Sequence, residues 1–160
     1  MDKNPRRRSA FTLVEVLIVV VIMAILAATI IPQFSDSSKD AKISSMKFNL
    51  HTLRSQVELY KAQHDGSPPA VLGNLTARTN AVGAVMGATD DPALFPYGPY
   101  IRVLPDNPFS TAAAGSRNAV KAASANPPGT SDVTAAGAGG WLYHAASGGV
   151  WLDNSEYLTE

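Results

Sequence analysis

One carboxylate stands inside a long apolar segment near the N-terminus. The segment runs from Phe11 to Ile31, and Glu15 is its only charged residue. An ionised carboxylate within a membrane-spanning helix costs about 2.5 to 3.5 kcal/mol on insertion scales, so such a residue is expected to have a partner. The alternative is a glutamate near the helix end that reaches water. Glu15 is therefore the first candidate for chemistry, and that chemistry is charge pairing.

Other side chains that catalyse reactions or bind metals show no recognisable pattern. The chain has no cysteine, which excludes disulfides, thiolate metal sites and thiol nucleophiles. Its three histidines lack metal-ligand spacing, and the sequence has neither a Gly-rich phosphate loop nor a nucleophile turn. Residues 1–10 carry a net charge of +3, so the remaining residues carry −3 and present no basic face for nucleic acid. We expect no enzyme activity, no cofactor and no nucleic-acid partner.

The apolar segment is long enough to cross a membrane. Its 21 residues would extend about 31 Å as an α-helix, close to the hydrocarbon thickness of about 30 Å. A signal peptide would have a shorter apolar core, and so apolar a helix would be hard to cover in a small domain. Four basic residues precede the segment and favour the cytoplasmic side of the membrane: Lys3, Arg6, Arg7 and Arg8. We therefore expect a single-pass protein with a cytoplasmic N-terminus.

The helix is expected to continue beyond the membrane. Pro32 follows the apolar segment and would kink the helix rather than end it, because helical periodicity resumes at once. One narrow apolar stripe then recurs at spacings of three and four: Ile43, Met46, Leu50, Leu53, Val57 and Tyr60. Gly66 and the prolines after it provide a stop. The pattern predicts one helix from about Thr12 to His64, with its second half packed on a head.

The remaining residues predict a small β-sheet head. We expect a short helix near residues 71–77, an extended stretch at 98–105 with a turn after it, and an exposed loop at 111–140, which holds 10 Ala and 5 Gly. Residues 141–144 and 150–153 read as a β-hairpin. Trp141 and Trp151 are expected to pack against the long helix.

The N-terminal residues carry a family resemblance. Arg-Arg-Arg-Ser-Ala followed by Phe-Thr-Leu-Val-Glu at positions 6–15 resembles the signature of type IV pilins and type II secretion pseudopilins. The resemblance implies a pilin-like α+β fold and a basic leader that prepilin peptidase removes between Ala10 and Phe11. It implies that Phe11 is then N-methylated and that Glu15 meets the α-amino group of a neighbouring subunit's first residue. The family usually has Gly where this chain has Ala10.

A second resemblance lies in the head. GPYIRVLPDNPF at 98–109 and GGWLYHAASGGVWLDN at 139–154 resemble the sheet region of the major, G-type pseudopilin of type II secretion. This implies a homopolymeric pseudopilus that supports protein export across the outer membrane, with an inner-membrane assembly platform and minor pseudopilins as partners and a periplasmic head. Some members bind calcium, for which Asp106, Asp132 and Asp153 are available oxygen ligands.

Two alternatives remain open at this point. One is a surface type IV pilin used in adhesion, motility or DNA uptake, and the other is a monomeric membrane-anchored binding module. If the chain is a pseudopilin, the sequence predicts four parts. They are a leader at 1–10, a transmembrane or assembly helix at 11–31, its amphipathic continuation at 32–66, and a head at 67–160 that contains the 111–140 loop.

Overall fold

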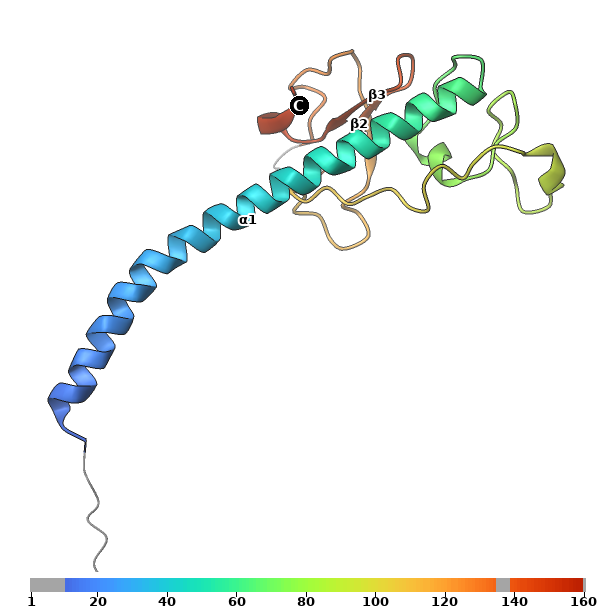
Figure 1. Ribbon diagram of the computed structural model, residues 1–160. Coiled ribbons are helices and arrows are strands. Elements are labelled where there is room, and N and C mark those ends of the chain that lie inside the picture. The colour runs from blue at the N-terminus through green and yellow to red at the C-terminus, as the bar shows by residue number, and fades with distance from the viewer. Residues whose placement is uncertain (1–10, 135–138, 160) are drawn as a thin grey trace, which may run out of the picture. The chain divides into compact units, whose positions relative to one another are not determined.

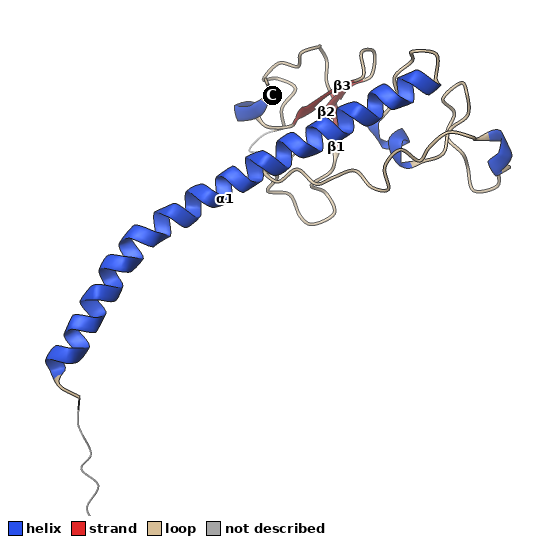
Figure 2. Cartoon of the chain, in the orientation of Figure 1, coloured by secondary structure: helices blue, strands red, loops and turns tan. Residues whose placement is uncertain are grey.

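The computed structural model describes residues 11–134 and 139–159. The predicted leader at 1–10 lies outside the described residues, as does part of the predicted loop. The chain divides into two compact units, one ending at Ala41 and the other beginning at Lys42, and each is described by itself. Figures 1 and 2 show the elements in chain order, with one long helix followed by a small sheet. The pilin-like α+β fold is confirmed.

In the first unit the helix α1 (Leu13–Gln63) is apolar and uncovered. From Leu13 to Ile31 its large apolar side chains are between 44% and 81% exposed. By length and composition this part of α1 could cross a membrane. The helix runs without interruption through position 32, so the predicted continuation beyond Pro32 is confirmed. An apolar helix left this exposed requires lipid or protein around it.

In the second unit α1 packs on the head through the predicted apolar stripe. Met46, Leu50, Leu53, Val57 and Tyr60 are at most 3% exposed and form one core with residues of the sheet. The helix ends as predicted, because the Gly66 amide donates to the Lys61 carbonyl oxygen at 2.8 Å and Gly66 has a φ of +78°. This left-handed conformation favours glycine.

The sheet has three strands in the order β1, β2, β3: β1 (Val120–Ala122), β2 (Trp141–His144) and β3 (Gly149–Leu152). β2 and β3 form the predicted antiparallel hairpin, with Trp141 opposite Leu152. β1, however, pairs in parallel with β2, so the sheet is mixed. The 111–140 segment is therefore not wholly loop. β1 escaped prediction because its three residues are all exposed and it is held by backbone hydrogen bonds, which leave no side-chain pattern.

The two faces of the sheet separate the two tryptophans. Trp141 is fully buried in the core with the helix stripe, as predicted. Trp151 lies opposite Leu142 in the register and packs with Ala123, Leu142 and Leu158 in a second cluster. Successive side chains of a strand point to opposite faces. Trp151 therefore packs outside the core that Trp141 shares with the long helix, although it lines an open pocket together with Arg54 and Glu58 of that helix.

The segment between α1 and β1 is mostly irregular. It contains two 3₁₀ helices, η1 (Leu72–Thr76), close to the short helix predicted there, and η2 (Pro92–Leu94). The predicted extended stretch at 98–105 forms no strand in the described structure. The amides of Tyr100 and Ile101 instead donate to the Leu75 carbonyl oxygen at 2.8 and 3.1 Å. A third short helix, η4 (Ser155–Tyr157), closes the described chain.

Candidate functional site

Glu15 is held at the start of α1 by Thr12. One oxygen of its carboxylate, Oε2, accepts hydrogen bonds from the Thr12 backbone amide and the Thr12 hydroxyl, each at 2.8 Å. The Glu15 amide in turn donates to the Thr12 hydroxyl oxygen at 3.2 Å. This reciprocal arrangement is a capping box, which satisfies amides that the first helical turn leaves without partners. Thr12 therefore orients the Glu15 carboxylate within a single chain.

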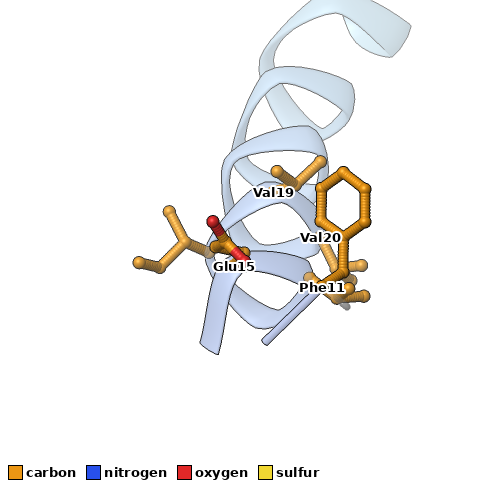
Figure 3. Close-up of a pocket in the computed structure, with 6 residues that line it drawn as sticks. Phe11, Glu15, Val19 and Val20 are labelled. Atoms are coloured by element: carbon orange, nitrogen blue, oxygen red, sulfur yellow. The ribbon is translucent and has the colours of Figure 1, made fainter. Parts of the chain in front are cut away.

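Phe11 and Glu15 share one open groove on the apolar helix. The groove is lined by Phe11, Glu15, Val16, Ile18, Val19 and Val20. Figure 3 shows Phe11 and Glu15 at the same end of the helix, with Val19 and Val20 above them. Phe11 is 85% exposed. The site therefore consists of one carboxylate beside apolar side chains. Among the described residues of the first unit, no other segment covers it.

Along the chain after Glu15, no cation lies close in sequence to this carboxylate. The sequence has no Lys, Arg or His between Phe11 and Ser38. In an apolar environment an uncompensated carboxylate is costly, and opposite charges attract far more strongly there than in water. The countercharge for Glu15 must come from the residues before it, from the chain's own start, or from another molecule.

The structure brings together only some of the predicted site residues. Phe11 and Glu15 line the same groove, whereas Pro32 lies further along α1. Ala10 and the arginines at positions 6–8 lie outside the described residues. Their predicted roles in processing and membrane orientation stay predictions.

Two of the carboxylates that were candidates for calcium ligands accept hydrogen bonds from loops of the chain itself. Asp132 accepts from the Ser124 and Gly129 amides, both at 3.0 Å. Asp153 accepts from the Thr134 amide at 2.7 Å and the Thr134 hydroxyl at 2.5 Å. Within residues 11–134 and 139–159, no three His, Cys, Asp or Glu side chains gather as a metal site would require. Calcium binding, including any role for Asp106, stays a prediction.

Sequence reasoning missed two features of the second unit. The first is a buried polar link in which the His64 ring contacts the Tyr60 carbonyl oxygen at 2.8 Å and the Thr79 hydroxyl at 3.0 Å. The second is an exposed face of α1 around Phe48, which is 71% exposed. Along the second half of the helix, uncharged residues recur seven positions apart, and this repeat could have revealed the exposed face. No local pattern in the sequence indicates that His64 contacts Thr79.

Comparisons with known proteins cover most of the chain. Residues 5–31 match the family model described as the prokaryotic N-terminal methylation motif. The chain is 31% identical over 104 residues to the type II secretion system core protein G of Aeromonas hydrophila, covering 65% of this chain and 69% of the relative. The protein of the same name from Klebsiella pneumoniae is 29% identical over 106 residues, 66% of this chain and 72% of the relative.

The similarity extends into the head. The type II secretion system core protein G of Vibrio cholerae is 28% identical over 138 residues, which is 86% of each chain. No solved structure gives a significant match. The resemblance therefore rests on sequence along most of the chain, and on the N-terminal motif that contains the Phe11–Glu15 site.

Proposed function

This chain belongs to the family of the type II secretion system core protein G, a family of pseudopilus subunits, and on that premise we propose how it is processed and assembled. Prepilin peptidase cuts the precursor between Ala10 and Phe11, and Phe11 becomes the N-methylated first residue. The mature chains then polymerise through their N-terminal helices. The filament is a homopolymer that extends from an inner-membrane assembly platform together with minor pseudopilins.

One observation carries this proposal: the apolar part of α1 is exposed along its whole length and holds a single charge, Glu15. Before assembly, lipid would cover this surface. In the filament, the helices of neighbouring copies would replace the lipid. Heterologous contacts that do not close into a ring generate a helical filament from identical subunits.

Glu15 sets the register of that assembly. The cut creates an α-amino cation at Phe11, four residues before Glu15. Within a dry helix bundle, the carboxylate of one copy and the amine of another neutralise each other, whereas each alone would be costly. Only an axial position that brings these two groups together avoids an unpaired charge. The pair therefore selects one stacking of the subunits.

The membrane orientation follows from the leader. Arg6, Arg7 and Arg8 hold the start of the precursor in the cytoplasm, which places the head in the periplasm.

The role of the chain is structural and not catalytic. The relatives described above are all secretion subunits, and nothing in the described structure favours a surface pilus or a monomeric binding module.

The test combines mass spectrometry with electron microscopy. The full chain is produced together with a type II secretion system, and sheared surface material is imaged. We expect filaments built from a chain whose intact mass corresponds to a methylated Phe11 start. A chain that retains residues 1–10 and forms no filaments would refute the proposal and favour a membrane anchor.

A further inference from the structure

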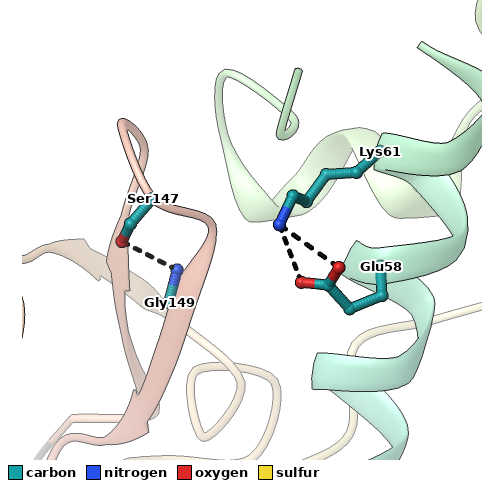
Figure 4. Close-up of polar contacts among 4 residues, drawn as sticks. All are labelled: Glu58, Lys61, Ser147 and Gly149. Carbon is teal, nitrogen blue, oxygen red and sulfur yellow. Dashed lines mark hydrogen bonds and ion pairs between the residues drawn. The ribbon is translucent and has the colours of Figure 1, made fainter. Parts of the chain in front are cut away.

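An open cleft lies where α1 meets the β2–β3 hairpin in the second unit. Its volume is about 320 Å³, at the lower end of the range of about 300 to 1,000 Å³ that small-molecule sites occupy. Figure 4 shows Glu58 and Lys61 of α1 facing the hairpin loop that contains Ser147 and Gly149. We name this space the hairpin cleft. Its lining side chains come from α1, from the loop after β1 and from the hairpin, and they include Arg54, Glu58, Asn126, Ser147 and Trp151.

Two glycines of the hairpin shape the cleft. Gly148 has a φ of +75°, and a Cβ atom there would lie 2.9 Å from the Val57 side chain of α1 and 3.0 Å from Pro68. Gly148 therefore lets the hairpin turn approach the helix closely. A Cβ atom on Gly149 would collide with the six-membered ring of Trp151. The indole thus lies over the place that a side chain at Gly149 would take, and it is only partly buried.

Polar side chains surround this indole, and the chain itself holds two of them in place. The Lys61 ammonium group contacts both oxygens of the Glu58 carboxylate, at 2.9 and 3.2 Å. The Ser147 hydroxyl oxygen accepts from the Gly149 amide at 3.3 Å. An ionised carboxylate has about four acceptor positions, so Glu58 can accept further hydrogen bonds. The exposed Asn126 amide offers both a donor and an acceptor.

The chemistry of the hairpin cleft disfavours several classes of ligand. Arg54 donates from Nε and Nη2 to the Val150 carbonyl oxygen at 3.1 and 2.9 Å, and this bond occupies an acceptor that a strand added at the edge strand β3 would need. Among the described residues that line the cleft, Arg54 and Glu58 are the only charged ones and have opposite signs.

The cleft therefore favours neither an anion nor a cation, and a single carboxylate is too few for a metal ion such as calcium. A wholly apolar ligand would remove water from the polar side chains without replacing their hydrogen bonds. The ligand that fits is uncharged and has both an apolar face and hydroxyl groups. Sugars have this combination, because the C–H groups of a pyranose ring form an apolar face while its hydroxyl groups lie around the rim.

We propose that the hairpin cleft binds a pyranose ring of a glycan. The C–H face of the sugar stacks on the indole of Trp151, which supplies a rigid apolar surface. The sugar hydroxyls donate to the Glu58 carboxylate and exchange hydrogen bonds with the Asn126 amide and the Ser147 hydroxyl. The open side of the cleft lets the neighbouring sugars of the glycan extend into solvent. This binding goes beyond a structural role in a filament, since all residues of the cleft belong to the second unit of one chain.

Tryptophan fluorescence tests binding at this site. The chain has two tryptophans, of which Trp141 is fully buried and Trp151 is partly buried. A bound sugar displaces water from Trp151 and should shift its emission to shorter wavelength, while Trp141 gives a constant background. The probes are chitotetraose, built from N-acetylglucosamine like cell-wall glycans, and cellotetraose, built from glucose like extracellular polysaccharides. We expect at least one of them to shift the emission of the detergent-solubilised full chain, and the preferred probe identifies the source of the glycan.

Two exposed substitutions test the polar contacts without disturbing the core. Glu58→Ala and Asn126→Ala should each weaken binding about tenfold, as the loss of one hydrogen bond to the ligand would. Isothermal titration calorimetry measures the affinity. Asp36→Ala is the matched control, because it also removes one exposed carboxylate from α1 but lies in the first unit. Its affinity should equal that of the wild type.

Substitution of Trp151 tests the stacking contact. Trp151→Ala should abolish binding, and Trp151→Phe, which keeps an aromatic ring, should restore part of it. Chemical denaturation checks that both variants are folded. Two results would overturn the inference: neither probe shifts the emission or releases heat at millimolar concentration, or Glu58→Ala and Asn126→Ala bind as tightly as the wild type. Filament assembly takes no part in these measurements, so their failure would leave the proposed function untouched.

Discussion

The Glu15 carboxylate and Thr12 are bonded to each other within one chain, through the Thr12 amide and hydroxyl at 2.8 Å each. Both bonds end on the same carboxylate oxygen. An ionised carboxylate offers about four acceptor positions, so the capping box leaves room for a cation from a second subunit. Capping and assembly therefore use the same side chain and do not exclude each other. The two roles can be separated by substitution.

The first prediction separates charge from capping. Glu15→Gln keeps an oxygen that can complete the capping box but removes the negative charge. We expect this variant to insert in the membrane and to be processed, yet to form few or no filaments. Thr12→Val keeps the charge and removes the hydroxyl, at a cost of about 1 kcal/mol to the helix start. It should still assemble. Electron microscopy of sheared material reads out both variants, and equal filament yields would contradict the assembly role of Glu15.

The second prediction concerns the buried link between α1 and the head. The Tyr60 carbonyl oxygen can only accept, so the His64 nitrogen Nδ1 donates to it at 2.8 Å, and the other ring nitrogen, Nε2, shares a hydrogen bond with the Thr79 hydroxyl at 3.0 Å. Thr79 is fully buried. Thr79→Val leaves Nε2 without its partner and should lower the free energy of unfolding by about 1 to 3 kcal/mol.

Chemical denaturation of the detergent-solubilised full chain measures this loss. Thr130→Val is the control, since Thr130 is exposed and its replacement should change stability by less than about 0.5 kcal/mol. Equal midpoints for the two variants would show that the link contributes nothing.

The third prediction is a dependence of stability on acid. Hydrogen bonds from the Ser124 side chain and backbone hold the pKa of Asp132 below its ordinary value. A carboxyl whose folded pKa is depressed stabilises the fold above its unfolded pKa of about 3.9, and the benefit is lost as pH falls through the folded pKa. Asp132→Asn should therefore be less stable than the wild type at neutral pH, and the difference should shrink below about pH 4. Thermal unfolding across this range tests it, and a pH-independent difference would contradict it.

The fourth prediction concerns the junction of β1 and β2. A Cβ atom on Gly140 would collide with the Ala119 carbonyl oxygen and would lie 2.7 Å from the Ala119 nitrogen, both backbone atoms. The same carbonyl oxygen accepts from the Trp141 amide at 2.8 Å. Gly140→Ala should therefore separate the strands and cost about 1 to 3 kcal/mol. Gly73→Ala is the control, because nothing lies within 4 Å of a Cβ there. Hydrogen exchange of the Trp141 amide would report the separation, and unchanged protection would disprove it.

The features that sequence analysis predicted correctly are those with local or periodic signals. The apolar segment with its single Glu15, the continuation of α1 past position 32, and the turn at Gly66 all follow from residues near one another in the chain. The buried stripe from Met46 to Tyr60 follows from helical spacing. These signals depend on side-chain chemistry repeated at a known period, so they are present before any tertiary contact forms.

The tertiary structure alone decided the features that depend on long-range pairing. β1 joins the sheet through backbone groups that every residue possesses, so neither its existence nor its parallel direction leaves a mark in its side chains. The register of the hairpin turned Trp151 to the face opposite Trp141, because one step along a strand reverses the side chain. The hydrogen bond between His64 and Thr79 exists only because the folded chain returns to the end of α1 after the helix. Sequence determines which residues favour burial, whereas their partners are decided by where the folded backbone brings distant segments together.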